Sequence, residues 1–280
     1  LISKAHAATR TLTKQKPFNN SVSSIFIFGD STVDPGNNNY IGTPFKSNFP
    51  PYGRDFVNHI PTGRFTNGRL VTDFVASYVS IKDYVPPYLD PTLSVEELMT
   101  GVSFASAGSG FDPLTSQLSL VISISKQLEY FREYKTRLEV AIGKKRTKNL
   151  IKAAFYIVSA GTNDFAVNYF GAGALVRQPS YSISSYQQFL MQNIQQFIQG
   201  LGDQGARKIV VVGLPPLGCL PGIITLHSND AIHQRGCIEK LSSIARDYNR
   251  MLQNKLKAMQ NSSFTIFYAD IYKPLSDTIQ

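Results

Sequence analysis

Short apolar runs recur along the chain, and each breaks off at glycine or polar residues. These runs occupy 25–28 (IFIF), 101–105 (GVSFA), 153–159 (AAFYIVS), 208–214 (KIVVVGL) and 264–268 (FTIFY). Runs of β-branched and aromatic residues of this length are typical of strands buried on both faces, as in a parallel sheet. We therefore predict five strands.

Segments with helical spacing lie between these runs. Val71, Phe74, Val75 and Tyr78 follow a helical repeat. We predict helices over 70–79, 118–142, 182–201 and 238–259. Strands that alternate with helices indicate an α/β fold with a mostly parallel sheet covered on both faces. No linker divides the chain, so we predict a polar N-terminal arm over 1–24 and one domain over 25–280.

A segment rich in glycine, proline and asparagine separates the first strand from the first helix. It covers 34–68 and contains GNNNY at 36–40 and PPYG at 50–53. Connections of this length are uncommon in compact domains unless they serve a function. We therefore expect the segment to wrap around a site.

Three predicted strand ends carry groups suited to acyl transfer. Ser31 follows the first run in a Gly-Asp-Ser turn, Gly108 follows the second run, and Asn163 follows the third. Parallel strands bring their carboxyl ends to one edge of the sheet, where open α/β folds bind ligands. A nucleophilic hydroxyl needs donors aimed at the developing oxyanion. The N–H groups of Ser31 and Gly108 and the amide of Asn163 would supply them. Each residue alone is an ordinary turn or cap residue, so the hypothesis depends on all three.

Six segments in order along the chain carry a family resemblance. They are FGDSTVDPGNNN (28–39), GRFTNGR (63–69), GVSFASAGSG (101–110), SAGTND (159–164), GLPPLGCLP (213–221) and RGCIEK (235–240). Together they resemble plant GDSL esterases/lipases of the SGNH hydrolase family. The resemblance implies a flavodoxin-like three-layer α/β/α sandwich and ester hydrolysis through an acyl-enzyme, with no metal and no cofactor. At the matching positions, Ser31 would be the nucleophile, with Gly108 and Asn163 as oxyanion donors.

The chain departs from the family pattern in two places. Ser103 stands where the second block of the family usually has asparagine. The Asp-x-x-His block expected after the last strand is not found before Gln280. Asp230 and His233 spell that pattern, but they precede the last predicted helix, and we interpret them as a chance match. We therefore expect a domain truncated at both ends, without its catalytic Asp and His, that hydrolyses esters weakly because a serine needs a base.

Two other functions are compatible with such a sheet. One is a catalytically inactive GDSL-like protein that binds lipid or cell-wall ester, which the missing histidine favours. The other is a nucleotide-binding domain, which is disfavoured because the first strand is followed by neither a G-x-G-x-x-G turn nor a P-loop.

The composition and charge of the chain argue against nucleic acid as a partner and against a membrane-spanning segment. The chain has 280 residues, 42% of them hydrophobic and 17% charged, and a net charge of +9. The basic residues are dispersed except at 144–148 (KKRTK), which we interpret as a solvated basic loop, with attraction to an acidic matrix or anionic surface as the alternative. No zinc-finger spacing or RNP signature accompanies them, so we expect no nucleic acid. No apolar run approaches the roughly 20 residues of a membrane span. We expect a monomer that acts on a small-molecule or lipid ester.

Several weak signals favour secretion. Ala5-His6-Ala7 resembles the small-x-small end of a signal peptide, although no hydrophobic stretch precedes it. N-glycosylation sequons begin at Asn19 and Asn261. The two cysteines, Cys219 and Cys237, suit one disulfide in a secreted protein, and two free thiols are the alternative. We expect an extracellular glycoprotein.

Overall fold

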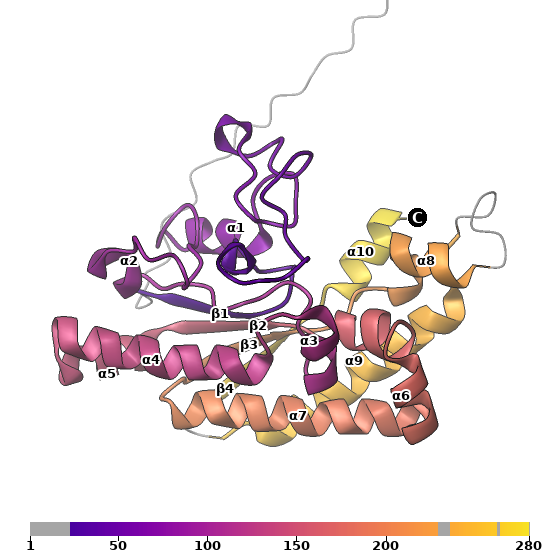
Figure 1. Cartoon of the computed structure of the whole chain (residues 1–280). Helices are drawn as coiled ribbons and strands as arrows, with labels where there is room; N and C mark the ends of the chain where they lie inside the picture. The colour runs from indigo at the N-terminus through magenta and orange to yellow at the C-terminus, as the bar shows by residue number, and fades with distance from the viewer. Residues whose placement is uncertain (1–22, 229–235, 262–263, 280) are drawn as a thin grey trace, which may run out of the picture.

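Four parallel strands form one sheet (Figure 1). The computed structural model describes residues 23–228, 236–261 and 264–279. The strands lie side by side in chain order and are β1 (Ile25–Gly29), β2 (Phe155–Ser159), β3 (Lys208–Val212) and β4 (Thr265–Ala269). Each neighbouring pair is parallel. The predicted α/β fold with a parallel sheet flanked by helices is confirmed.

The prediction of a fifth strand over 101–105 is wrong, although the segment lies beside β1. Hydrogen bonds join it to Ile27, whose N–H donates to Val102 and whose carbonyl accepts from Phe104. Only Ser103 forms bridges, one to Ile27 and one to Pro87. Gly101 has a φ of 97°, and the N–H of Ala105 donates to the Ser103 hydroxyl. Hydrogen bonds from Ile25 to the carbonyl of Thr100 and from Ser106 to the carbonyl of Gly29 continue along β1, so the segment lies against β1 without forming a regular strand.

One face of the sheet is covered by four long helices. They are α4 (Ile124–Ile142), α5 (Lys144–Ala153), α7 (Ile183–Asp203) and α9 (Glu239–Met259). Phe26 of β1 packs on Phe131 and Tyr134 of α4, with ring centroids 5.4 and 5.1 Å apart. This face holds the main hydrophobic core.

Two of these helices differ from the prediction. The single helix expected over 118–142 is broken: α3 (Pro113–Ser119) ends at Leu120, which has a left-handed φ of 53°. The next helix, α4, starts afresh at Ser123, whose hydroxyl accepts from the N–H of Lys126. The solvated basic loop expected at 144–148 is instead the start of α5. Its apolar residues Leu150 and Ile151 are buried, which holds the basic segment in a helix.

The opposite face of the sheet carries α1 (Val71–Tyr78) over β1 (Figure 1). The predicted helix is confirmed, but its apolar stripe faces solvent. Val71, Phe74 and Tyr78 are 73%, 56% and 67% exposed, whereas Asp73 and Ala76 are buried. The apolar repeat predicted the helix but does not mark its buried side, because the buried ion pair between Arg64 and Asp73 fixes the orientation of α1.

The remaining elements are short, and a disulfide ties one of them, the 3-10 helix η4 (Leu217–Cys219), to the segment before α9. Cys219 and Cys237 are bonded, which confirms the predicted bridge. No helix within the described ranges is long and apolar enough to cross a membrane. The short elements are η1 (Asn37–Tyr40), η2 (Val57–His59), α2 (Val95–Met99), η3 (Asp164–Tyr169), α6 (Ala174–Ser180), η4 (Leu217–Cys219), α8 (Pro221–His227) and α10 (Tyr272–Ile279).

Candidate active site

Ser31 lies in the turn that follows β1, at the carboxyl edge of the sheet, and is half-buried. Gly29 ends the strand opposite Ser159 with a φ of 143°, and a Cβ there would stand 1.9 Å from the Ser159 carbonyl oxygen. Only glycine fits so close to β2. The N–H of Asp30 donates to the same carbonyl at 3.0 Å, so the turn that presents Ser31 is fixed on β2.

The loop that contains Gly108 is fastened to the end of β1. The N–H of Ser106 and the hydroxyl of Ser109 both donate to the carbonyl of Gly29, at 3.0 and 2.7 Å. Gly108 itself has a φ of 91°, a conformation that favours glycine. The loop therefore lies against the strand end two residues before Ser31.

Asn163 follows β2 and reaches the same loop. Its side-chain Nδ2 donates to the carbonyl of Ser109 at 2.9 Å. The hydrogen bonds of Gly29, Ser109 and Asn163 therefore join three segments that are far apart in sequence. Ser31, Gly108 and Asn163 each lie within two residues of these bonds or make one themselves. The structure thus brings together the segments that carry all three predicted site residues.

A buried acid under this edge was missed in the sequence. Asp164 accepts from the N–H groups of Phe111 and Asp112 at 2.8 and 3.0 Å, and from the hydroxyl of Thr115. Burial raises the pKa of Asp164 to about 7, against the effect of these donors. Asp164 fixes the orientation of the segment that contains Asn163. Its position next to Asn163 was the only signal in the sequence.

The neighbouring acid, Asp112, forms an ion pair. Arg177 of α6 donates to both of its carboxylate oxygens at 2.6 Å, and Tyr186 donates to one of them at 3.0 Å. Asp112 is fully buried, so this pair is partly desolvated and holds α6 and α7 against the loop after Gly110. A bidentate pair of this kind fixes geometry as well as charge.

Asp34 connects the long segment 34–68 to the Gly108 loop. Its carboxylate accepts from the N–H groups of Gly36 and Asn37 at 2.8 and 2.7 Å, and from that of Ala107 at 2.9 Å. Burial raises the pKa of Asp34 to about 6. The prediction that this segment wraps around the site is therefore consistent with its anchor, one residue before Gly108.

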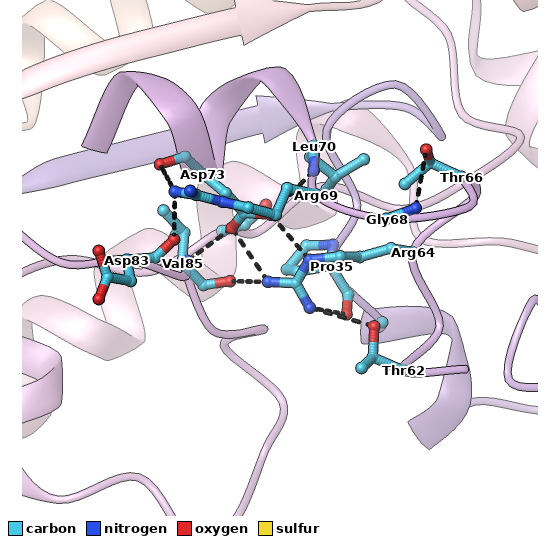
Figure 2. Close-up of polar contacts among 12 residues, drawn as sticks. Pro35, Thr62, Arg64, Thr66, Gly68, Arg69, Leu70, Asp73, Asp83 and Val85 are labelled. Carbon is cyan, nitrogen blue, oxygen red and sulfur yellow. Dashed lines mark hydrogen bonds and ion pairs between the residues drawn. The ribbon is translucent and has the colours of Figure 1, made fainter. Parts of the chain in front are cut away.

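A second ion pair fixes the later part of the segment to α1 (Figure 2). Arg64 donates to both carboxylate oxygens of Asp73 at 2.9 and 3.0 Å, and also to the carbonyl of Val85. Both side chains are buried. Asp73 also accepts from the N–H groups of Leu70 and Val85, which explains why this side of α1 turns inward.

Comparison with known proteins agrees with this geometry. Residues 25–280 match the family described as GDSL-like lipase/acylhydrolase. The chain belongs to this family. Three relatives from Arabidopsis thaliana illustrate the similarity: GDSL esterase/lipase At5g45960 is 57% identical over 264 residues, GDSL esterase/lipase At1g06990 46% over 256, and GDSL esterase/lipase APG 42% over 268. The matches cover 93%, 91% and 95% of this chain and 70%, 70% and 74% of the relatives.

Membership in the GDSL family confirms the predicted resemblance and the predicted class of enzyme, a carboxylic ester hydrolase. It does not favour the alternative of an inactive binding protein. The assignment of individual residues to catalytic roles is a separate matter, because the family match covers the domain as a whole.

The two histidines in the described part of this GDSL chain, His59 and His227, contact groups other than Ser31. His59 in η2 is exposed and its ring Nδ1 is hydrogen-bonded to the carbonyl of Arg54. His227 lies near the ring of Phe170, with centroids 6.1 Å apart. Neither is hydrogen-bonded to Ser31 within the described part of the chain. His6, Asp230 and His233 lie outside the described residues, so the interpretation of Asp230 and His233 as a chance match stays a prediction.

No group of three or more His, Cys, Asp or Glu side chains that could hold a metal ion occurs among residues 23–228, 236–261 and 264–279. The expectation of a reaction without metal or cofactor remains a prediction from the family resemblance.

Proposed function

We propose that Ser31 is the nucleophile of ester hydrolysis through an acyl-enzyme. The observation that carries the proposal is the set of hydrogen bonds from Ser106 and Ser109 to the Gly29 carbonyl and from Asn163 to Ser109. These bonds hold the turn of Ser31, the Gly108 loop and Asn163 at one edge of the sheet. Preorganised donors next to a nucleophile are what acyl transfer requires.

We propose three donors for the oxyanion. They are the backbone N–H groups of Ser31 and Gly108 and the second amide hydrogen of Asn163. The first amide hydrogen of Asn163 is donated to the Ser109 carbonyl, and this bond limits rotation of the side chain. A donor that is already oriented stabilises the developing charge without reorganisation during the reaction.

The proposed reaction has two halves. The hydroxyl oxygen of Ser31 attacks the ester carbonyl while its proton passes to a base, and the carbonyl oxygen takes up negative charge. Collapse of this intermediate breaks the bond to the alcohol, which leaves with a proton, and an acyl-serine remains. Water then attacks the acyl-serine, releases the carboxylic acid and restores the hydroxyl of Ser31.

We infer that the general base is neither His59 nor His227. The bond of His59 to Arg54 and the position of His227 beside Phe170 support this exclusion. Replacement of either histidine by glutamine should therefore leave the hydrolysis rate unchanged. A large loss with His59→Gln or His227→Gln would contradict the inference.

The setting of the reaction is also a proposal. We propose that the substrate is a small-molecule or lipid ester and that the protein acts outside the cell as a monomer. The Cys219–Cys237 disulfide supports an oxidising compartment, because such bridges are rare in reducing ones.

Covalent labelling tests the role of Ser31 without depending on turnover. An activated fluorophosphonate ester should modify Ser31, with a mass increase that peptide mass spectrometry assigns to the segment 25–46. Ser31→Ala should abolish the label. Ser125→Ala, which removes an exposed hydroxyl on α4, is the matched control and should label normally. A label on another serine would refute the proposal.

A further inference from the structure

The amino edge of the sheet carries a cleft remote from the carboxyl edge that holds Ser31. Its lining comes from the end of α4, from α5, and from the turn between α7 and β3, and its volume is about 430 Å³. The chain enters β2 after α5 and enters β3 after α7, so the cleft lies where these strands begin. Strands of five residues span about 17 Å, which separates the cleft from the edge where Ser31 lies. In Figure 1, α5 is at the left end of the molecule, whereas α3 lies to its right.

Positive charge predominates in this cleft. Five cationic side chains line it against two carboxylates, and the difference is +3. The cations are Lys135, Lys144, Lys148, Lys152 and Arg207, and the acids are Glu139 and Asp203. A concave surface with an excess of one sign concentrates ligands of the other sign.

Three of these cations form a regular row, which we call the lysine stripe: Lys144, Lys148 and Lys152. They recur every four residues on α5 and therefore lie on one side of the helix, with a rise of about 6 Å per step. All three are exposed, and none forms an ion pair or a side-chain hydrogen bond within the described part of the chain. Within residues 23–228, 236–261 and 264–279, the stripe therefore has no ion-pair partner, and the carboxylates of Glu139 and Asp203 offset only part of the positive charge of the cleft.

The remaining cations of the cleft are anchored. The ammonium group of Lys135 donates to the backbone carbonyl and to the side-chain Oε1 of Gln204 at 2.7 and 3.0 Å. Burial lowers the pKa of Lys135. Arg207 donates from Nη1 to the carbonyls of Gly202 and Ala206. Lys135 and Arg207 are thus held in place beside the exposed side chains of the stripe.

The position of the stripe weakens the helix that carries it. The first turn of α5 contains Lys144, Lys145 and Arg146, no acidic residue, and no side-chain cap. Aligned peptide dipoles place positive partial charge at this end of a helix, so cations there are unfavourable. An anion bound at this end of α5 would offset this cost.

We propose that the lysine stripe and its cleft bind an acidic polysaccharide, a polymer that carries one carboxylate per sugar unit. The step of about 6 Å along the stripe is comparable with the length of a sugar unit. Glu139 and Asp203 support a saccharide over a polyphosphate, because their carboxylates can accept hydrogen bonds from sugar hydroxyl groups, which a polyphosphate lacks. An extracellular polymer also agrees with the disulfide.

The site is independent of catalysis. It holds the protein on a matrix through α5 while the edge around Ser31 stays free to meet an ester. Binding at the stripe therefore needs neither the hydroxyl of Ser31 nor turnover, and loss of one function leaves the other intact.

The test compares two triple variants with the same change in net charge. The site variant is Lys144→Gln, Lys148→Gln and Lys152→Gln. The control replaces three lysines of α9 and is Lys240→Gln, Lys255→Gln and Lys257→Gln. Binding to polygalacturonate, to neutral dextran and to vesicles of anionic phospholipid is measured at 50 and 200 mM salt, with thermal unfolding as a check that each variant folds.

We expect the wild type and the control to bind polygalacturonate, more weakly at high salt because the charges are exposed. The site variant should bind about tenfold more weakly or worse, as expected when three exposed charge contacts are lost. Ser31→Ala should bind like the wild type. Equal losses of polygalacturonate binding in both triple variants would overturn the proposal. So would vesicle binding that depends on the stripe, if the wild type does not bind polygalacturonate.

Discussion

Around Ser31, at the carboxyl edge of the sheet, Asp30, Asp34 and Asp164 are buried and accept hydrogen bonds from backbone and hydroxyl groups. At the amino edge, the lysine stripe is exposed and has no internal partner within the described ranges. Buried acids with several donors fix the loops that surround a site. Exposed cations fix nothing in the fold, and their charge is available to a ligand. At one edge of the sheet, buried carboxylates hold the loops of a site in place. At the other edge, exposed ammonium groups can attract a ligand of opposite charge.

The largest expected effect is the loss of hydrolysis when the hydroxyl of Ser31 is removed, while binding at the amino edge is kept. In any form of the protein that has its general base, Ser31→Ala should lower kcat/KM for a p-nitrophenyl ester by about 10³-fold or more, because the acyl-enzyme cannot form. Initial rates measure this loss. Binding to polygalacturonate should not change, and a variant that kept half of its activity would show that Ser31 is not the nucleophile.

Removal of one oxyanion donor should have the next largest effect. Asn163→Ala should lower kcat by about 10²-fold while KM changes little, because the donor acts on charge present only in the transition state. Asn193→Ala is the matched control, since the Asn193 amide also donates to a backbone carbonyl, that of Phe111. Similar kinetic losses in both variants would mean that Asn163 acts only through the stability of the loop.

Stability should depend on pH through the carboxyl edge. Burial raises the pKa of Asp30 and Asp34 to about 6 and that of Asp164 to about 7, from 3.8. A raised pKa in the folded state means that the stabilising contribution is full below about pH 4 and is lost as pH rises to about 7. Each of the three groups should lower the free energy of unfolding by about 1.4 kcal/mol per pH unit while it is protonated in the folded state only, so the slope should be steepest near pH 5, where all three contribute.

Urea denaturation at several pH values between 4 and 7 measures this slope. Asp164→Asn should reduce it most near pH 7, because that substitution removes the group with the highest of the three pKa values. The lysine stripe should contribute nothing to the slope, so an unchanged slope in Asp164→Asn would contradict the origin assigned to it.

The smallest expected effect lies at the amino edge. Lys144→Gln should stabilise the protein by about 0.3–1 kcal/mol, because it removes a cation from the positive end of α5. Lys257→Gln should have the opposite sign, since Lys257 lies in the last turn of α9, where a cation is favourable. Thermal unfolding at low salt measures both shifts, and equal signs would rule out the dipole explanation.

Apolar patterning predicted most of the sheet but not the details that depend on distant partners. The runs at β1 and β2 are almost wholly buried, whereas β3 and β4 alternate buried residues with partly or fully exposed ones, and all four runs are strands. Ser103 belonged to a similar run, yet its hydrogen bonds are shared with Pro86, outside the sheet. The left-handed conformation of Leu120 ends α3 within the single helix predicted over 118–142. Neither outcome could be read from local periodicity.

The sequence predicted the candidate site residues that directly follow the apolar runs, but not the buried acids that support them. Ser31, Gly108 and Asn163 could be grouped because parallel strands end at a common edge. The supporting acids could not, because the sequence does not show that Asp34 meets Ala107 or that Asp164 meets Phe111. Polar partners more than fifty residues apart leave no periodic signal, so such residues are found only once the fold is known.

The ion pair between Arg64 and Asp73 also bears on how the molecule opens (Figure 2). Arg64 belongs to the long segment, Asp73 belongs to α1, and both are buried, so neither can be exposed to water without leaving a desolvated charge behind. Local unfolding of the segment near Arg64 and fraying of α1 are therefore one event. Their amide hydrogens should exchange with solvent together, as a single cooperative unit that opens apart from the sheet.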